Sequence, residues 1–253
     1  MQHITLLVVA VGFSITTLVP ASWAGVVMSE TSVDTSPAGA RTVNRTIYVQ
    51  GNKQKVEKAE VDSITDLDKG VVYIVDKLHK RYLEMPISRS VPDEMGSGDS
   101  QGETINLDNT HGTRVVAKQT CTEYRGGHTN EVERIAVSAC VSRSAPGTSE
   151  VIAFDEKFSR AVGSEDQGPQ NGTAGLVLEQ RSTVSFRVPD PTRGDAYRVA
   201  SFASKTEIRE IRLRPLPEAT FAPPESFSRV TSAPAAPTPR PAPHAPDKDE
   251  YRV

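Results

Sequence analysis

The stretch ITDLDKGVVYIVDKLHKRYLEMP, residues 64–86, has the pattern of adjacent antiparallel strands. Residues 68–70, DKG, are a turn sequence in which the glycine can adopt a positive φ. Residues 71–75 are apolar and mostly β-branched, which is typical of a strand covered on both faces. After a second turn at 76–80, residues 81–86 alternate in polarity until a proline ends the ladder. The stretch therefore predicts a β-meander.

Residues 1–24 have the features of a secretory signal peptide. An apolar core from Ile4 to Val19 is followed by Pro20 and small residues, and we expect cleavage after Ala24. The core is too short and too often interrupted for a membrane span, which needs about 18 or more apolar residues. An uncleaved N-terminal anchor is the alternative, because no Lys or Arg precedes the core. We expect a periplasmic or secreted protein with no transmembrane anchor after cleavage.

Two cysteines, Cys121 and Cys140, are the only ones in the chain. In an oxidising compartment, such a pair within one secreted domain predicts a disulfide. The C-x-x-C spacing that is typical of redox-active pairs is absent. Both cysteines lie in strand-like segments, at 113–125 and 132–142, so the bridge is expected to join neighbouring strands.

The charge of the chain is nearly balanced, with 29 Lys and Arg against 32 Asp and Glu and a net charge of −3. The sequence shows no basic stripe of the kind that neutralises phosphates, so it does not favour nucleic-acid binding.

Composition divides the chain into four parts. After the signal peptide, residues 25–41 are small and polar and are expected to be a flexible N-terminal segment. A β-rich domain follows at 42–227. Residues 228–253 are rich in Pro and Ala, which predicts a disordered tail.

One segment, APGTSEVIAFDEKFSRAV at 145–162, predicts a helix, with Thr148 or Ser149 as its N-cap and Glu150 in the first turn. Its apolar face must pack on the sheet, because the sheet is the only large partner. Along 176–188 the polarity alternates cleanly, which predicts a strand with one dry face. The apolar residues of the helix and of this strand are Val151, Phe154, Phe158, Val162, Leu176, Leu178, Val184 and Phe186. Near the end of the domain, the alternation slips between Ile208 and Ile211, which predicts a β-bulge.

Three motifs are candidates for sites of chemistry. Gly98–Gly102 matches G-x-S-x-G around Ser100, but no strand precedes it and no helix follows it, as a nucleophile elbow requires. The acidic residues Asp62, Asp66 and Asp68 lack the ligand spacing of a calcium loop and are better explained by turns. The histidines are far apart and show no zinc-binding spacing. We therefore predict no catalytic residue and no metal site.

The order of these parts resembles LolA-like domains, a family of bacterial periplasmic proteins that includes the lipoprotein carrier. The opening similarity lies in RTIYVQGNKQKVE, residues 45–57, and in residues 63–86, with their VYIVD and closing YLEMP. The end is similar as well, where TEIREIRL leads into PLPEATFAPPESF at 215–227. In outline, the resemblance covers 42–227.

The resemblance implies an α+β fold, in which an open and strongly curved antiparallel sheet, a half-barrel, carries one or two helices on its concave face. It also implies an acyl chain held between sheet and helix, with the apolar residues named above as the candidate trough. We therefore predict a non-enzymatic binding or carrier protein, without cofactor, for an apolar ligand such as a lipid or an acylated protein. The alternative is a cell-envelope interaction module that captures a protein partner through its sheet edge or its Pro-rich tail.

Overall fold

The computed structural model describes residues 24–89, 105–163, 174–189 and 197–231. Within these residues the elements are β1 (Gly25–Ser36), β2 (Gly39–Gln50), β3 (Lys53–Glu57), β4 (Val61–Asp66), β5 (Val71–Asp76), β6 (Arg81–Pro86), β7 (Asp108–Val116), β8 (Gln119–Thr129), β9 (Glu133–Ser142), α1 (Thr148–Ala161), β10 (Leu176–Pro189), β11 (Tyr197–Arg214) and β12 (Ser228–Val230), with short 3₁₀ helices η2 (Ile87–Arg89) and η6 (Glu218–Phe221).

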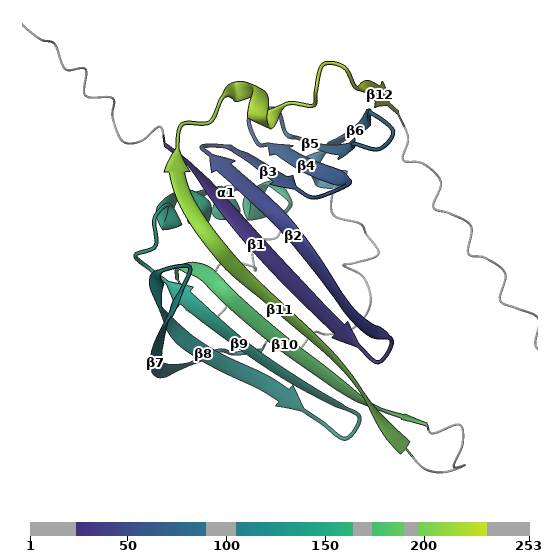
Figure 1. Ribbon diagram of the computed structural model, residues 1–253, viewed down its shortest axis with the longest axis vertical. Coiled ribbons are helices and arrows are strands. Elements are labelled where there is room, and N and C mark those ends of the chain that lie inside the picture. Colours follow the sequence, from purple (N-terminus) through teal and green to yellow (C-terminus); the bar gives the residue numbers. More distant parts are fainter. Residues whose placement is uncertain (1–23, 90–104, 164–173, 190–196, 232–253) are drawn as a thin grey trace, which may run out of the picture.

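All the strands belong to one sheet, in the order β12-β6-β5-β4-β3-β2-β1-β11-β10-β9-β8-β7. Neighbouring strands run antiparallel, except that β12 lies parallel to β6. The sheet is curved and open, and α1 lies behind it in Figure 1. The predicted α+β class, a curved antiparallel half-barrel with a helix on one face, is confirmed.

The predicted meander is β4, β5 and β6, which pair in sequence order. In the turn after β4, the Lys69 N–H donates a hydrogen bond of 3.1 Å to the Asp66 carboxylate. Gly70 completes this turn with a φ of 66°, which other residues adopt at a cost. Asp66 is buried, and its carboxylate shapes the turn while lying 3.4 Å from Lys69 Nζ.

The N-terminal segment differs from the prediction, because residues 25–36 form β1 and not a flexible lead. β1 pairs with β2 on one side and with β11 on the other, which makes it a central strand of the sheet. Val26, Val27 and Met28 are buried at its start. Its polar second half is held by the same two ladders, so backbone pairing with long neighbours outweighs the polar composition.

Two β-bulges shift the strand register near the centre of the sheet. In β11, Glu210 pairs with Ser29 and Ile208 pairs with Glu30, so Arg209 is the extra residue. This confirms the bulge predicted between Ile208 and Ile211. In β10, Val177 pairs with Val141 and Glu179 with Cys140, and Leu178 is extra. A bulge turns consecutive side chains toward one side, and both Leu178 and Glu179 are buried.

The helix α1 lies where the sequence predicts it, but neither predicted N-cap is used. Gly147 is the N-cap with a φ of 79°, and no side chain caps the helix. A Cβ at Gly147 would lie 2.4 Å from Cγ2 of Val26, so the chain passes too close to β1 for another residue. Glu150 instead accepts a hydrogen bond from the Gly51 N–H in the turn after β2.

The C-terminal part of the fold extends further than predicted. Leu216 and Phe221 pack with Ile64, Tyr73 and Val75 in a second core. The chain then reaches β12, which pairs with β6 through residue 230, inside the range that composition predicts to be disordered. The proline-rich segment 215–227 therefore covers the sheet, because its few large apolar residues reach a face that no other described element covers. The rest of the predicted tail, 232–253, and most of the predicted signal peptide lie outside the described residues.

Cys121 and Cys140 form the predicted disulfide, with Cα atoms 5.4 Å apart. They lie on the paired strands β8 and β9, out of direct register, since Cys140 pairs with Glu123. Both are buried in the same core as α1.

Candidate ligand-binding groove

The structure divides the predicted trough residues into two groups. Val151, Phe154, Leu176 and Leu178 are buried together in the core between α1 and the sheet, and Phe158 packs against them. Val162 ends the helix as its C-cap. Val184 and Phe186 lie six or more residues further along β10, about 20 Å away from Leu178 at the rise of an extended strand. The helix–sheet contact itself is therefore a filled core, and the ligand-binding role of these residues remains a prediction.

An open groove of about 220 Å³ runs beside this core, between α1 and the sheet. Its floor is apolar and comes from four strands, with Met28 on β1, Ile47 on β2, Leu176 on β10 and Ile208 on β11. Met28 and Ile47 are direct partners across the β1–β2 ladder. Residues from strands far apart in sequence therefore build one apolar surface.

The helix provides the other wall of the groove, through Val151, Ile152 and Asp155. Val177, at the bulge of β10, lines the rim with 41% of its side chain exposed. Asp155 is exposed at this rim, and desolvation by the surrounding groove raises the pKa of its carboxyl group to about 6. No described residue forms an ion pair with it.

Glu30 is the second acidic group of the groove, and it is neutralised. Its buried carboxylate forms an ion pair with the Nε of Arg45, which faces it across the β1–β2 ladder. Ser32 donates a further hydrogen bond to the same carboxylate. This paired charge leaves the apolar floor as the main feature that a ligand would meet.

The described residues offer this groove no assembled catalytic chemistry. No group of three or more His, Cys, Asp or Glu side chains within them is placed to hold a metal ion. Ser100, the residue of the G-x-S-x-G match, lies outside the described residues. What the groove can do is enclose part of an apolar molecule beside a titratable carboxyl group.

The sequence did not indicate Met28, Ile47, Ile152, Asp155 or Ile208 as groove residues. Met28 lies in the segment expected to be flexible, and Ile208 lies where the alternation slips. The one available signal was the short apolar run GVVM at 25–28, which is typical of a strand start and of a signal-peptide boundary alike.

No protein-family model matches the chain, and no curated protein matches it. Similar solved structures include a putative outer membrane lipoprotein-sorting protein domain from Vibrio parahaemolyticus, with 7% identity, a TM-score of 0.31 and coverage of 79% of this chain and 89% of that one. A LolA superfamily protein from Nitrosomonas europaea has 7% identity, a TM-score of 0.29 and coverage of 79% and 90%. PNGF-II has 7% identity and a TM-score of 0.37, with 83% of this chain covered, and this chain spans only 31% of its length.

One of these solved structures is a LolA superfamily protein, and the sequence resembles LolA-like domains. Because their TM-scores lie well below 0.5, we take no ligand or activity from them, and the fold class rests on the strand order and curvature of this chain. Among the described residues, no helix is long and apolar enough to span a membrane.

Proposed function

We propose that the chain is a non-enzymatic, extracytoplasmic binding protein that holds the apolar part of a ligand, such as a lipid or a lipoprotein acyl chain, in the groove beside α1. The observation that carries this proposal is the open groove beside α1, whose apolar floor of Met28, Ile47 and Ile208 is the surface of the filled core that faces the groove. The disulfide and the signal-peptide pattern support an oxidising, extracytoplasmic compartment.

The size of the groove limits what it holds. Sites for small molecules commonly have volumes of roughly 300–1,000 Å³. At about 220 Å³, the groove encloses a segment of an acyl chain, and the remainder of the ligand lies at the surface. The carboxyl group of Asp155 at the rim, when it is ionised, disfavours an anionic group directly beside it.

The test is a titration with a fluorescent fatty acid that carries a dansyl group at the end of its chain. Val177→Trp places a large side chain in the groove from an exposed position. Val61→Trp is the matched control, because Val61 is a strand valine with 39% exposure that does not line the groove. We expect saturable binding to the wild type and to Val61→Trp, and binding that is at least tenfold weaker for Val177→Trp. Absence of saturable binding, or equal loss in both variants, contradicts the proposal.

A second candidate function is capture of a protein partner at the sheet edge. β7 is the last strand of the sheet order and pairs only with β8 among the described strands. Val115 on β7 is exposed. An edge of this kind can add a strand from another chain. Replacing a β7 residue that faces outward by proline would then abolish partner binding without affecting the fatty-acid titration.

A further inference from the structure

One face of the strands β8 to β11 carries a row of basic residues. The register places Arg125, Ser138, Arg181 and Lys205 side by side across the four strands, since Arg125 pairs with Ser138, Ser138 with Arg181, and Arg181 with Lys205. Direct partners in a ladder point to the same side of a sheet. We call the side of the sheet that these residues share the basic face.

An acidic row lies next to the basic row, two residues along each strand. It consists of Glu123, Glu179 and Glu207. Each carboxylate forms ion pairs with at least two cations. Glu179 lies within 3.3 Å of Arg114, Arg181 and Lys205. Glu123 and Glu207 are shared in the same way, and Arg209 also binds Glu207.

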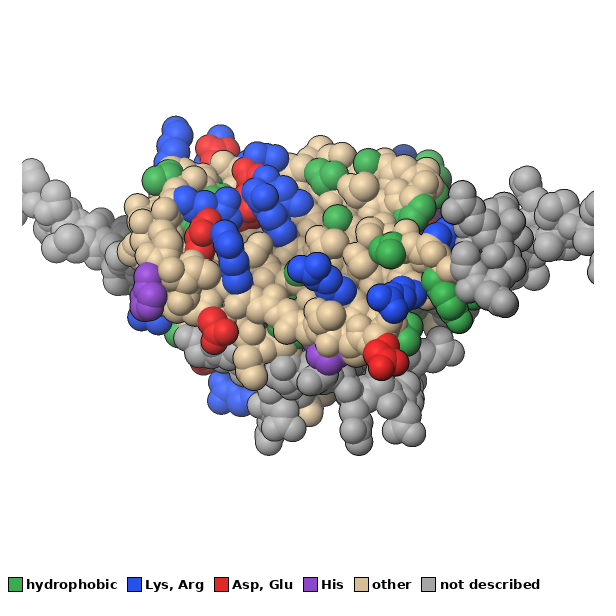
Figure 2. Space-filling view, turned by 90° about the horizontal axis from the view of Figure 1, so that it is seen from below, with side chains coloured by type: hydrophobic (Ala, Val, Ile, Leu, Met, Phe, Trp, Pro, Cys, Tyr) green, Lys and Arg blue, Asp and Glu red, His purple; other side chains and the backbone are tan. Residues whose placement is uncertain are grey.

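Positive charge exceeds negative charge on the basic face. Along β9 and β10, Arg134 and Arg187 continue the same side, because they lie an even number of residues from Ser138 and Arg181. The cations of the face are Arg114, Arg125, Arg134, Arg181, Arg187, Lys205 and Arg209, against the three carboxylates named above and that of Asp108, which pairs with Arg125 in the β7–β8 ladder. Figure 2, which views the molecule from below the orientation of Figure 1, shows several Lys and Arg side chains gathered on one part of that end of the molecule, with fewer Asp and Glu among them.

Several guanidinium groups on this face keep free donors. Arg181 contacts Glu179 through Nε alone, at 2.7 Å. Arg125 is 70% exposed and lies 3.7 Å from its one carboxylate, Glu123, which is longer than a hydrogen bond. Arg134 and Arg187 have no acidic partner among the described residues. The acidic row therefore orients part of the cluster and leaves the outer arginines available.

Small side chains cover the surface between the arginines. Gly127, Ala136, Thr183 and Ala203 form the next row across the strands, and their side chains are small. A hollow of about 80 Å³ lies between Arg114, Glu123, Arg125, Ser138 and Arg181, and the Glu123 carboxylate in its wall is paired with Arg114. It has room for several water molecules and for one oxyanion of phosphate size, but not for an acyl chain. Arg134 lies beyond this row of small residues, about 14 Å along β9 from Ser138.

We propose that the basic face binds phosphate groups, carried either by a soluble compound or by the headgroups of a lipid surface. The guanidinium group matches the geometry of phosphate oxygens and donates two parallel hydrogen bonds to them. A first phosphate sits in the hollow beside Arg125 and Arg181, and a second group of a larger ligand reaches Arg134. This site is on strands β7 to β11 and does not depend on the groove beside α1.

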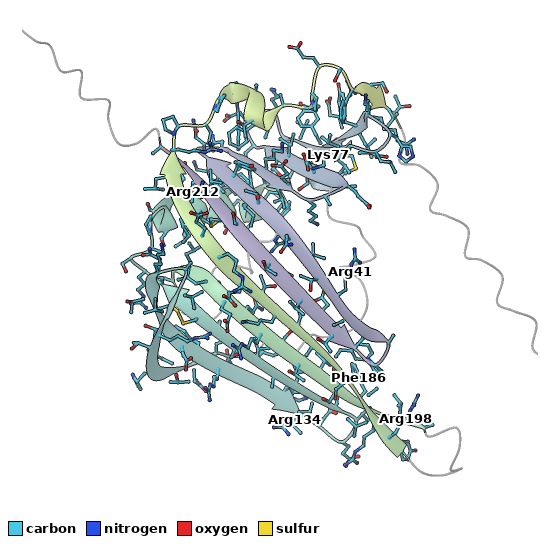
Figure 3. All side chains as sticks on the ribbon, viewed as in Figure 1. Arg41, Lys77, Arg134, Phe186, Arg198 and Arg212 are labelled. Atoms are coloured by element: carbon cyan, nitrogen blue, oxygen red, sulfur yellow. A yellow bond between two sulfur atoms is a disulfide. The ribbon has the colours of Figure 1, made fainter. Side chains whose placement is uncertain are left out.

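The test compares two double variants that remove the same charge from the two sides of the sheet. Arg125→Gln/Arg134→Gln removes two exposed arginines of the basic face. Arg41→Gln/Arg198→Gln is the control, because both arginines point to the opposite side of the sheet. Arg198 lies an odd number of residues from Lys205 along β11. Arg41 pairs with Asp34, and the residue before Asp34, Val33, pairs with Lys205. Figure 3 labels Arg41, Arg134 and Arg198, and none of these three has an acidic partner to lose among the described residues.

Each protein is titrated with inorganic phosphate, with acetate at equal ionic strength as the reference, and with phosphatidylcholine vesicles with and without phosphatidic acid. We expect the basic-face variant to bind about tenfold or more weakly, since each arginine near an anionic surface contributes about fivefold, and the control variant to bind like the wild type. Binding of inorganic phosphate with this pattern identifies a soluble source. The same pattern with phosphatidic acid vesicles alone identifies a lipid headgroup. Equal loss in both variants, or no binding of either probe, overturns the proposal.

Discussion

Glu179 combines burial with three cationic neighbours, Arg114, Arg181 and Lys205. Its side chain is 3% exposed. Burial raises the pKa of Glu179, but hydrogen bonds from Arg114 and Arg181, the charge of Arg114 and the hydrogen bond from Lys205 outweigh this and lower it to about 2. A carboxylate whose pKa is lowered on folding stabilises the native state only while it is ionised.

We predict that Glu179→Gln destabilises the protein by about 2 kcal/mol at pH 7, because three cations lose their shared carboxylate while remaining partly solvated. The contribution is complete above the unfolded pKa of 4.5 and is lost as the pH falls toward 2. Urea unfolding at a series of pH values should show the difference between variant and wild type shrinking across this window.

The control for this prediction is Glu210→Gln, since Glu210 pairs with Arg212 at the exposed surface of β11. An exposed pair of this kind contributes less than about 1 kcal/mol. A loss in Glu179→Gln that does not depend on pH would show that packing, and not the charge, accounts for the effect.

At the scale of the element, α1 is held by one central side chain and by two polar contacts. Phe154 is 1% exposed and stacks on Phe158 with ring centroids 6.2 Å apart. Glu150 and Lys157, two turns apart, bind Gly51 and Asn52 in the turn after β2. The helix is therefore fixed to the sheet along its length, which leaves the groove beside it with a rigid wall.

We predict that Phe154→Ala lowers the free energy of unfolding by about 3–5 kcal/mol, as expected for removing a fully buried aromatic side chain. Phe158→Ala, at a partly buried position, should cost less than half as much. Urea unfolding monitored by far-UV circular dichroism measures both. A loss below about 1 kcal/mol for Phe154→Ala would place this residue at a ligand surface instead of in the core.

At the scale of the whole molecule, the segment after β11 completes the core on one end of the sheet. Leu216 and Phe221 cover Ile64, Tyr73 and Val75, and the Leu216 N–H donates to the side chain of Gln50 at 3.0 Å. Without this segment, the predicted meander would expose one of its apolar faces.

We predict that ending the chain after Arg214 lowers the melting temperature by about 6–24 °C. The burial of two large apolar side chains contributes about 3–6 kcal/mol, and each kcal/mol corresponds to about 2–4 °C for a domain of this size. Ending the chain after Thr231 retains η6 and β12 and should change the melting temperature by less than about 2 °C. Differential scanning calorimetry distinguishes the two, and equal melting temperatures would show that the segment does not stabilise the sheet.

The features that the sequence by itself determined are local ones. The meander of β4 to β6, the bulge in β11 and the apolar face of α1 follow from side-chain periodicity over a few residues, and the disulfide follows from two cysteines on adjacent strands. Periodicity reports which side a residue faces relative to its own neighbours in the chain.

Tertiary structure alone decided β1, the groove and the basic face. β1 is polar in composition, and it becomes a central strand because β2 and β11 pair with both of its edges. The groove joins Met28 to Ile208, and the basic face joins Arg125 to Lys205, across separations that no local pattern encodes. A net charge of −3 conceals a local excess of arginine, because strand register, and not composition, determines which charges become neighbours.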